Sequence, residues 1–267
     1  MIIIVAEVIF MDNAISSASR SIHGLGALQD PHAYAGAKNK FKDLDADFHK
    51  QINSILALGL PPIDLIHQFP IHNGYVNLAR YLFLYDLYKQ CYQLSGHLAD
   101  LGTWKGASFF FMAKLVKIFE PLTLTQVHGF DWFEGMKQTA GEDDTTSEGT
   151  YAYDYTTLLK LIQIQEFEDI AILHKMDLTT DLGPFFEKSP YLRFKMVFID
   201  CGTTKVIDKS LEYFWPRLVQ GGILIMDHYN CESSPSESKL LEKYVGKNHI
   251  RQSPFTRSPT AYVIKEQ

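Results

Sequence analysis

Carboxylate side chains follow several short apolar runs of this sequence, at points where strands of an α/β protein are expected to end. Asp100 lies in LADLG, Asp131 in GFDWF, Asp200 in VFIDC and Asp227 in LIMDH. Open α/β sheets bind their ligands at the carboxyl ends of their strands. Two groups of residues could therefore do chemistry: an acidic glycine turn around Asp100, and a pair of acids with a histidine around Asp227.

The glycine turn lies in the stretch Gly96–Met112. Leu98–Leu101 predicts a brief strand, and the apolar segment Ala107–Phe119 is long enough for a buried helix. Between them, Gly102 and Gly106 let the backbone turn tightly and approach a ligand. A helix that begins at such a turn offers its first amides to the ligand, so this stretch is a candidate nucleotide-binding turn.

The turn fits S-adenosylmethionine better than a dinucleotide. A dinucleotide fingerprint has three glycines as G-x-G-x-x-G, with an acidic residue about 20 positions further on. This turn has two glycines, and the acid Asp100 precedes them. A carboxylate there would repel pyrophosphate, but it suits a positive amine or sulfonium. A structural turn in some other α/β domain is the alternative.

Asp131 closes the second expected strand. A carboxylate in that position can accept hydrogen bonds from two hydroxyls, and hydrogen bonds to a charged acceptor are the stronger kind. Asp131 is therefore a candidate for binding a ribose. The alternative is that its side chain caps the turn before Trp132.

The second group consists of Asp200, Asp227 and His228. The two acids end strands that would be neighbours about 4.8 Å apart, so their carboxylates can face one crevice. Two carboxylates that close together need a cation or a shared proton. We therefore expect a divalent metal here; a pocket or interface role without a ligand is the alternative for His228.

The elements that position these residues alternate between strands and helices, which predicts an α/β fold. Its twisted sheet should be mostly parallel, with helices on both faces and an antiparallel C-terminal strand. The expected strands after the first are Val127–Asp131, Ile170–His174, Phe194–Asp200, Gly222–Met226 and Ala261–Lys265. The expected helices are Tyr155–Gln163, Lys205–Phe214 and Ser238–Val245.

The chain divides into three parts. Residues 1–45 are polar and aperiodic, which predicts a loosely packed N-terminal arm. Residues 46–95 predict a helical cap that leads into the core, with one helix ended by Pro61-Pro62 and a loop at Phe69–Gly74. Residues 96–267 form the expected cofactor-binding domain.

A helix is expected at Asn77–Gln90, directly before the glycine turn. Its apolar stripe should face the core and consists of Leu78, Tyr81, Leu82 and Tyr85. The helix should therefore pack beside the cofactor crevice and could carry part of its cover.

Composition and charge narrow the classes of partner. The 267 residues are 46% hydrophobic, enough for a full core, and carry a net charge of −6. No cluster of Lys and Arg marks a nucleic-acid partner, and the apolar N-terminus is too short to span a membrane. Cys91, Cys201 and Cys231 lack CxxC spacing, which suits a reducing cytoplasm. We expect a cytoplasmic protein, and the sequence is compatible with a homo-oligomer.

The motifs LADLGTWKGASF, HGFDWFEG, FKMVFIDC and LEYFWPRLVQGGILIMDHY, in this order, resemble the macrocin O-methyltransferase family. Its members are class I S-adenosylmethionine-dependent enzymes that methylate hydroxyls on sugars of antibiotics and related glycosides. The resemblance covers residues 70–265 and implies a Rossmann-like class I methyltransferase fold. It also implies cofactor binding by Asp100, Gly102, Thr103 and Gly106 at the methionine end, by Asp131 at the ribose and by Asp177 near the adenine.

The family pattern has Asp-x-Asp at the fourth strand and Asp-Asp at the fifth, which hold magnesium and supply a base. This sequence has Gly202 and His228 in place of the second acid of each pair. Magnesium is expected from the resemblance, and manganese, iron or zinc become possible because an imidazole replaces an oxygen ligand. Asp200 and His228 are the candidate bases, and both join Asp227 as candidate metal ligands.

These observations predict an S-adenosylmethionine-dependent O-methyltransferase, assisted by a divalent metal. Its acceptor would be a small molecule or glycan that offers a hydroxyl of a sugar, glycoside or related polyol. Two alternatives stay open. The missing acid at Gly202 favours a catalytically degenerate binding protein with this fold, and an NAD(P)-dependent oxidoreductase is disfavoured by the missing third glycine.

Overall fold

The computed structural model describes residues 50–137, 148–230, 235–256 and 260–266. The arm expected at residues 1–45 and Cys231 lie outside the described residues. The division of the chain at residues 45 and 95 stays a prediction. No helix among the described residues is both long and apolar enough to cross a membrane.

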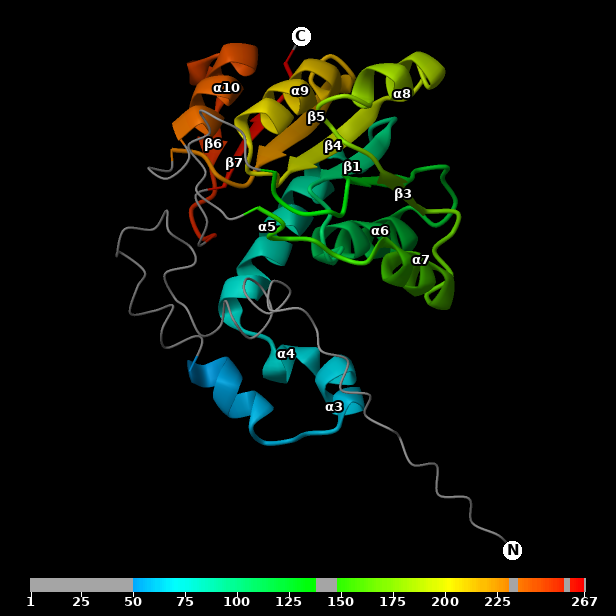
Figure 1. The fold of residues 1–267 in the computed structure, drawn as a ribbon, viewed down its shortest axis with the longest axis vertical. Coiled ribbons are helices and arrows are strands. Elements are labelled where there is room, and N and C mark those ends of the chain that lie inside the picture. The colour runs from blue at the N-terminus through cyan, green and yellow to red at the C-terminus, as the bar shows by residue number, and fades with distance from the viewer. Residues whose placement is uncertain (1–49, 138–147, 231–234, 257–259, 267) are drawn as a thin grey trace, which may run out of the picture.

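A seven-stranded sheet forms the centre of the molecule, with the order β3-β2-β1-β4-β5-β7-β6 (Figure 1). β1 to β5 pair in parallel, whereas β7 runs antiparallel to both β5 and β6. The strands are β1 (His97–Leu101), β2 (Val127–Asp131), β3 (Ala171–Lys175), β4 (Phe194–Ile199), β5 (Leu218–Met226), β6 (Arg251–Gln252) and β7 (Ala261–Ile264). The predicted mostly parallel sheet with an antiparallel C-terminal strand is confirmed.

Helices cover both faces of this sheet, and each face has its own buried core. One layer contains α5 (Tyr75–Cys91), α6 (Ala107–Phe119) and α7 (Tyr155–Ile164). The other contains α8 (Leu182–Lys188), α9 (Thr204–Phe214) and α10 (Pro235–Val245). Side chains alternate across the sheet, so Leu98 packs in the first core and Leu101 in the second.

Several elements differ from the sequence-based expectation. β2 and α6 have the predicted bounds, while β5 begins four residues before the predicted Gly222. The predicted loop at Phe69–Gly74 contains a short helix, α4 (Phe69–His72), and α3 (Pro62–His67) precedes it. The helical segment before Pro61-Pro62 ends at residue 56, ahead of the prolines that were predicted to end it. Pro62 is instead the first residue of α3, a position that proline tolerates because no backbone hydrogen bond is lost there.

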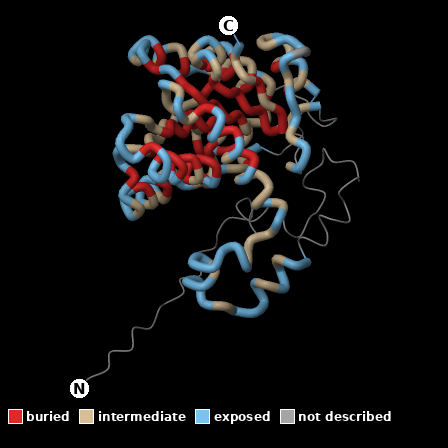
Figure 2. The backbone as a smooth tube through the Cα atoms, turned by 180° about the vertical axis from the view of Figure 1, so that it is seen from behind, coloured by how far each residue is buried: buried red, intermediate tan, exposed pale blue. Residues whose placement is uncertain are grey.

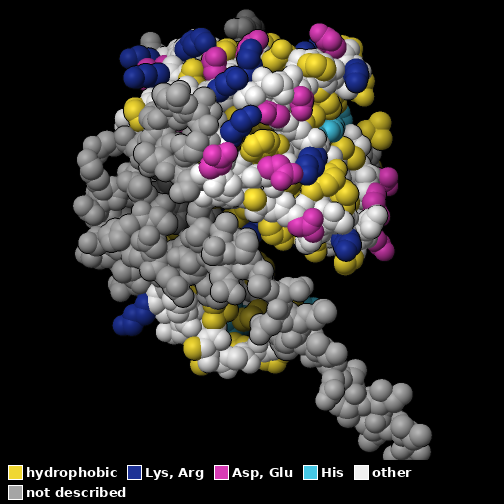
Figure 3. Space-filling model, viewed as in Figure 1, with side chains coloured by type: hydrophobic (Ala, Val, Ile, Leu, Met, Phe, Trp, Pro, Cys, Tyr) yellow, Lys and Arg dark blue, Asp and Glu magenta, His cyan; other side chains and the backbone are white. Residues whose placement is uncertain are grey.

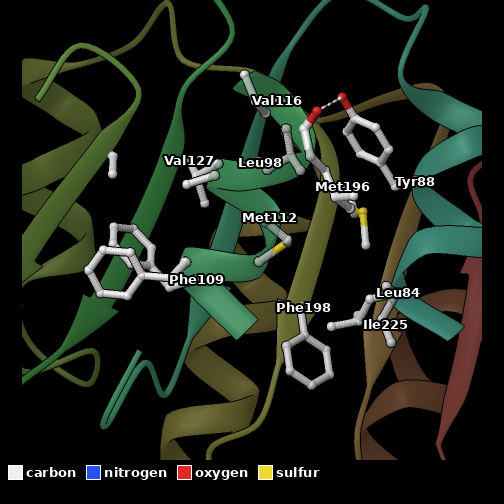
Figure 4. Close-up of a cluster of buried hydrophobic side chains, with 14 of the residues drawn as sticks. Leu84, Tyr88, Leu98, Phe109, Met112, Val116, Val127, Met196, Phe198 and Ile225 are labelled. Atoms are coloured by element: carbon white, nitrogen blue, oxygen red, sulfur yellow. Dashed lines mark hydrogen bonds between the residues drawn. The ribbon is translucent and has the colours of Figure 1, made fainter. Parts of the chain in front are cut away.

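The buried stripe of α5 is not the predicted one. Leu82 is 50% exposed, and Leu78, Tyr81 and Tyr85 are only partly buried. The side chains that reach the core are Phe83, Leu84, Leu87, Tyr88 and Cys91. Figure 4 shows Leu84 and Tyr88 among buried side chains of the sheet and α6. Because apolar residues lie on nearly every side of this helix, periodicity alone did not select the face that packs.

A buried ion pair lies between α6 and the start of β4. Lys195 Nζ is 2.6 Å from Glu120 Oε2, and their side chains are 1% and 5% exposed. The hydroxyl of Tyr88 donates to Glu120 Oε1 at 2.7 Å, and Lys195 also donates to the carbonyl of Tyr92. This network lies at the opposite edge of the sheet from the strand carboxyl ends, so its role is structural.

The described segment before α5 projects away from the sheet (Figures 1 and 2). Residues 50–56 are helical, and neither α3 nor α4 contains a buried residue. On the face of the molecule in Figure 3, basic and acidic side chains are interspersed over the sheet domain. The described residues on that face therefore form no basic stripe of the kind that binds nucleic acid.

Candidate functional site

The two groups of residues from the sequence meet at the carboxyl edge of the sheet. β1 and β4 are neighbours in register, with Leu101 beside Ile199, so the glycine turn and Asp200 leave the sheet side by side. Gly102 has φ +85°, and a Cβ added to it would collide with the carbonyl oxygen of Asp200. A glycine is therefore required for this close approach, which places the predicted cofactor turn against the predicted acid pair.

Asp100 is fully buried beneath the turn. Its Oδ1 accepts a hydrogen bond from the Ser108 hydroxyl at 2.7 Å, whereas its Oδ2 has no hydrogen-bond partner among the described residues. Burial raises the pKa of Asp100 to about 7, and the charge of Asp200 adds to the effect. A buried carboxylate oxygen without a donor is costly, so this atom suits a positively charged or hydrogen-bonding ligand group.

The turn itself is held by its own backbone and by Thr103. The Thr103 hydroxyl is buried and donates to the Asp100 carbonyl at 3.0 Å, and the Gly106 amide donates to the Thr103 carbonyl at 2.7 Å. Gly106 has φ +82° and precedes α6 as its N-cap. The Thr103 side chain thus orders the turn, and the start of α6 offers amides to a ligand.

Asp131 ends β2 beside this turn. Its Oδ2 accepts from the Trp104 amide at 2.8 Å and its Oδ1 from the Phe133 amide at 2.7 Å. The capping alternative is therefore present in the structure, although each carboxylate oxygen can accept a second bond. Burial raises the pKa of Asp131, and the bonds from the two amides oppose that shift. Its binding of a ribose stays a prediction.

Asp177 lies just beyond β3. The Met176 amide donates to the Asp131 carbonyl, which brings Asp177 close to the end of β2. Its Oδ1 accepts from both the amide and the hydroxyl of Thr179, at 2.8 and 2.6 Å. The side chain therefore organises the turn that leads to α8, and its predicted contact with an adenine is not tested by these bonds.

The structure brings Asp200, Asp227 and His228 together. Each offers one ligand atom, and these atoms all lie within 4.8 Å of one another. Asp200 follows β4 and Asp227 follows β5, and these strands are paired in parallel, as predicted. Asp227 is 2% exposed, while the side chains of Asp200 and His228 are 30% and 33% exposed. The last two are therefore the members that an acceptor can reach.

Arg80 of α5 is a site residue that the sequence did not reveal. Its Nη1 lies 2.9 Å from Asp200 Oδ2 and its Nη2 lies 2.6 Å from Asp227 Oδ2. The guanidinium is also 5.9 Å from the centroid of the Phe198 ring. Burial raises the pKa of the Asp227 carboxyl, and the charge of Arg80 opposes that rise. The sequence did contain a signal, because two adjacent carboxylates require a cation and Arg80 lies on the helix expected beside the crevice.

Two further polar residues surround the pair of strand ends. Thr260 donates its hydroxyl to Asp227 Oδ1 at 3.2 Å. His228 lies between two acids, with Nε2 3.8 Å from Asp227 Oδ2 and Nδ1 3.8 Å from Oε1 of Glu237, a buried residue in the first turn of α10. The imidazole therefore lies between two carboxylates.

The donor set fits a divalent cation. Two carboxylates and an imidazole at these separations are ligands that manganese, iron or zinc accept, and the oxygens suit magnesium. The glycine turn likewise fits a cofactor with a charged amine and no phosphate, because Asp100 presents an oxygen without a partner among the described residues. The geometry supports both predicted ligands, and the identity of the metal stays open.

Comparisons with known proteins concern the domain type and the fold. Residues 99–229 match a family model described as a methyltransferase domain. No curated protein sequence matches the chain. Two solved structures of the calicheamicin methyltransferase CalS11 are similar in fold, each at 20% identity and with TM-scores of 0.74 and 0.68. The first similarity covers 82% of this chain and 92% of that one, and the second covers 82% and 94%.

A third solved structure, the O-methyltransferase NovP, has 16% identity and a TM-score of 0.55. The similarity covers 71% of this chain and 80% of NovP. At these identities the likenesses concern the fold, and they confirm the expected Rossmann-like class I methyltransferase architecture.

Proposed function

We propose that this chain transfers the methyl group of S-adenosylmethionine to a hydroxyl of a sugar, glycoside or related polyol, with assistance from a divalent cation. The observation that carries the proposal is the contact between the two residue groups. The Gly102 turn lies against the backbone of Asp200, so a cofactor above the turn and an acceptor beside the acid pair would be adjacent. Methyl transfer needs that arrangement, because its two reactants must meet in line.

The cofactor side is assigned to the β1 and β2 strand ends. Asp100 would pair with the amine of the cofactor's methionine part through Oδ2, since a positive group there compensates the buried carboxylate. Asp131 would accept from the ribose hydroxyls with the lone pairs that its two amide bonds leave available. The cofactor supplies a methyl group on a sulfonium, which needs no covalent help from the protein.

The acceptor side is assigned to the β4 and β5 strand ends. Asp200 and Asp227, with or without His228, would hold the cation, whose positive charge would orient a hydroxyl and lower its pKa. The hydroxyl must lose a proton as it attacks: His228 would take it if the imidazole stays off the metal, and Asp200 or a water would take it if His228 binds the metal. The scheme with His228 as the base leaves the carboxylates of Asp200 and Asp227 to hold the metal, and it is the one tested below.

The choice of a sugar-like hydroxyl rests on likeness rather than on a bound acceptor. The sequence motifs resemble the macrocin O-methyltransferase family, and one CalS11 structure is described as a TDP-rhamnose 3'-O-methyltransferase. Polyols offer vicinal hydroxyls that one divalent cation can orient. Both considerations favour nucleotide sugars and glycosides as the first acceptors to test.

Labelled methyl transfer tests the proposal. The wild type is incubated with methyl-tritiated S-adenosylmethionine, manganese and a panel of nucleotide sugars and glycosides, beside the variants His228→Asp and His228→Ala. We expect labelled ether products from the wild type, and less product from His228→Asp although its oxygen ligands should retain the metal. A His228→Asp variant as active as the wild type would assign proton removal to Asp200 instead. Cofactor binding without turnover on any acceptor would favour a binding protein with this fold.

A further inference from the structure

The guanidinium of Arg80 binds the two carboxylates that would hold a divalent cation. Nη1 and Nη2 bind the Oδ2 atoms of Asp200 and Asp227, at 2.9 and 2.6 Å. Asp227 Oδ2 also lies 3.8 Å from Nε2 of His228, the third residue of the candidate metal group. The same two carboxylates thus serve the arginine and the proposed metal site.

Simultaneous occupation by both cations is unfavourable for two physical reasons. A divalent cation binds carboxylate oxygens at about 2.0 to 2.6 Å, which would place it against the hydrogens of the guanidinium. It would also bring two like-signed charges together in a partly buried crevice, where screening by solvent is weak. The geometry therefore allows either the arginine bridge or the metal on these oxygens.

We propose that Arg80 competes with the divalent cation and thereby sets the metal affinity of the site. The inference rests on the metal-assisted function proposed above and adds a residue from outside the strand ends. In this arrangement Arg80 balances the two carboxylates until a metal displaces it. The site then binds metal more weakly than its three ligands would by themselves, because each binding event first breaks two charged hydrogen bonds.

The position of Arg80 on α5 makes displacement structurally feasible. Buried side chains of this helix begin at Phe83, so Arg80 lies on the part of α5 that is not packed into the core. The neighbouring Tyr81 ring packs against Phe111 of α6, with centroids 4.9 Å apart, and retains the helix when the arginine leaves. The Arg80 side chain is 37% exposed, so it has solvent on one side into which it can swing.

Titration of the purified full chain with manganese chloride, followed by calorimetry and by the electron paramagnetic resonance of free manganese, tests the competition. Arg80→Met removes the guanidinium and keeps an apolar stem, and Arg80→Lys keeps one charge that cannot bridge both acids. Lys89→Met removes an exposed positive charge from the same helix and serves as the control. Circular dichroism confirms that each variant is folded before its titration is interpreted.

We expect Arg80→Met to bind manganese about 10- to 100-fold more tightly than the wild type, the factor for lost hydrogen bonds to charged groups. The manganese affinity of Arg80→Lys should lie between those of the wild type and Arg80→Met, and the affinity of Lys89→Met should match that of the wild type. If Arg80→Met binds manganese and the wild type does not, that result would also support the competition. Equal or weaker binding by Arg80→Met, or no binding by either protein, would overturn it.

A parallel titration with S-adenosylhomocysteine separates this inference from the proposed function. If the wild type does not bind S-adenosylhomocysteine, that result contradicts the methyltransferase proposal. The ratio of the manganese affinities of Arg80→Met and the wild type can still be interpreted. Normal cofactor binding with unchanged metal affinity in Arg80→Met would contradict the role of Arg80 alone.

Discussion

Replacing Asp131 by alanine separates a structural role of this residue from a functional one. The structure shows two amide bonds to its carboxylate, from Trp104 at 2.8 Å and Phe133 at 2.7 Å. A hydrogen bond to a charged group contributes about 1.5 to 3 kcal/mol. Because both amides share one carboxylate and are not independent, we expect Asp131→Ala to lower the free energy of unfolding by about 2 to 4 kcal/mol.

The same substitution should weaken cofactor binding if Asp131 also accepts from a ribose. The expected loss is about 1.5 to 3 kcal/mol, or roughly 10- to 150-fold in the dissociation constant of S-adenosylhomocysteine. Asp131→Asn is the matched control, since it keeps the shape and one acceptor oxygen but presents an amino group where one donor now binds. Its effects on stability and on affinity should both be intermediate.

Two measurements on each protein decide between the roles. Urea denaturation gives the free energy of unfolding, and calorimetry at a temperature where every variant is folded gives the affinity for S-adenosylhomocysteine. If Asp131→Ala unfolds more easily but binds the ligand as tightly as the wild type, the residue only caps the loops, and the assignment to the ribose is refuted.

Two further predictions concern stability. Lys195→Met should lower the free energy of unfolding by about 3 to 5 kcal/mol in urea denaturation, because it leaves the buried Glu120 carboxylate without its cation. A loss below about 1 kcal/mol would show that the pair is not desolvated. The second prediction concerns the pH dependence of stability: burial lowers the pKa of His128 to about 3 and of His174 to about 4, from an ordinary 6.5, so the unfolded chain binds more protons than the folded chain below pH 6.5. The free energy of unfolding should therefore fall by about 1.4 kcal/mol per pH unit per histidine as the pH is lowered from 6.5 to 4. The double variant His128→Phe, His174→Phe should lose this slope, and an unchanged slope would contradict the assignment.

The sequence predicted the parts of the fold in which local pattern and tertiary packing agree. β2 and α6 have the predicted bounds, and α6 is a largely apolar segment with a clear start after Gly106 and a clear end before Pro121. α8 was not predicted, since it is short and contains Gly183 and Pro184, which usually signal a turn. Pro184 is compatible with the helix because it lies in the first turn, where its missing amide would have no partner.

The site shows the same division between local and long-range information. The sequence placed four acids at one edge of the sheet: Asp100, Asp131, Asp200 and Asp227. Strand ends are a local signal, and parallel pairing brings the carboxyl ends of the strands to the same edge. Arg80 is 120 residues from Asp200 in the chain, and it reaches the acids only through the packing of α5. The face on which α5 packs was the feature that periodicity assigned wrongly, so the same error concealed the arginine.

Equilibrium titration of the wild-type protein with S-adenosylhomocysteine, beside NADPH as the competing cofactor class, tests the central claim most directly. The account predicts saturable binding of S-adenosylhomocysteine at one site per chain, and no binding of NADPH at the same concentrations. It also predicts that Asp131→Ala weakens the first interaction. Binding of NADPH without S-adenosylhomocysteine, or of neither, would contradict the assignment of the glycine turn and with it the proposed methyltransferase function.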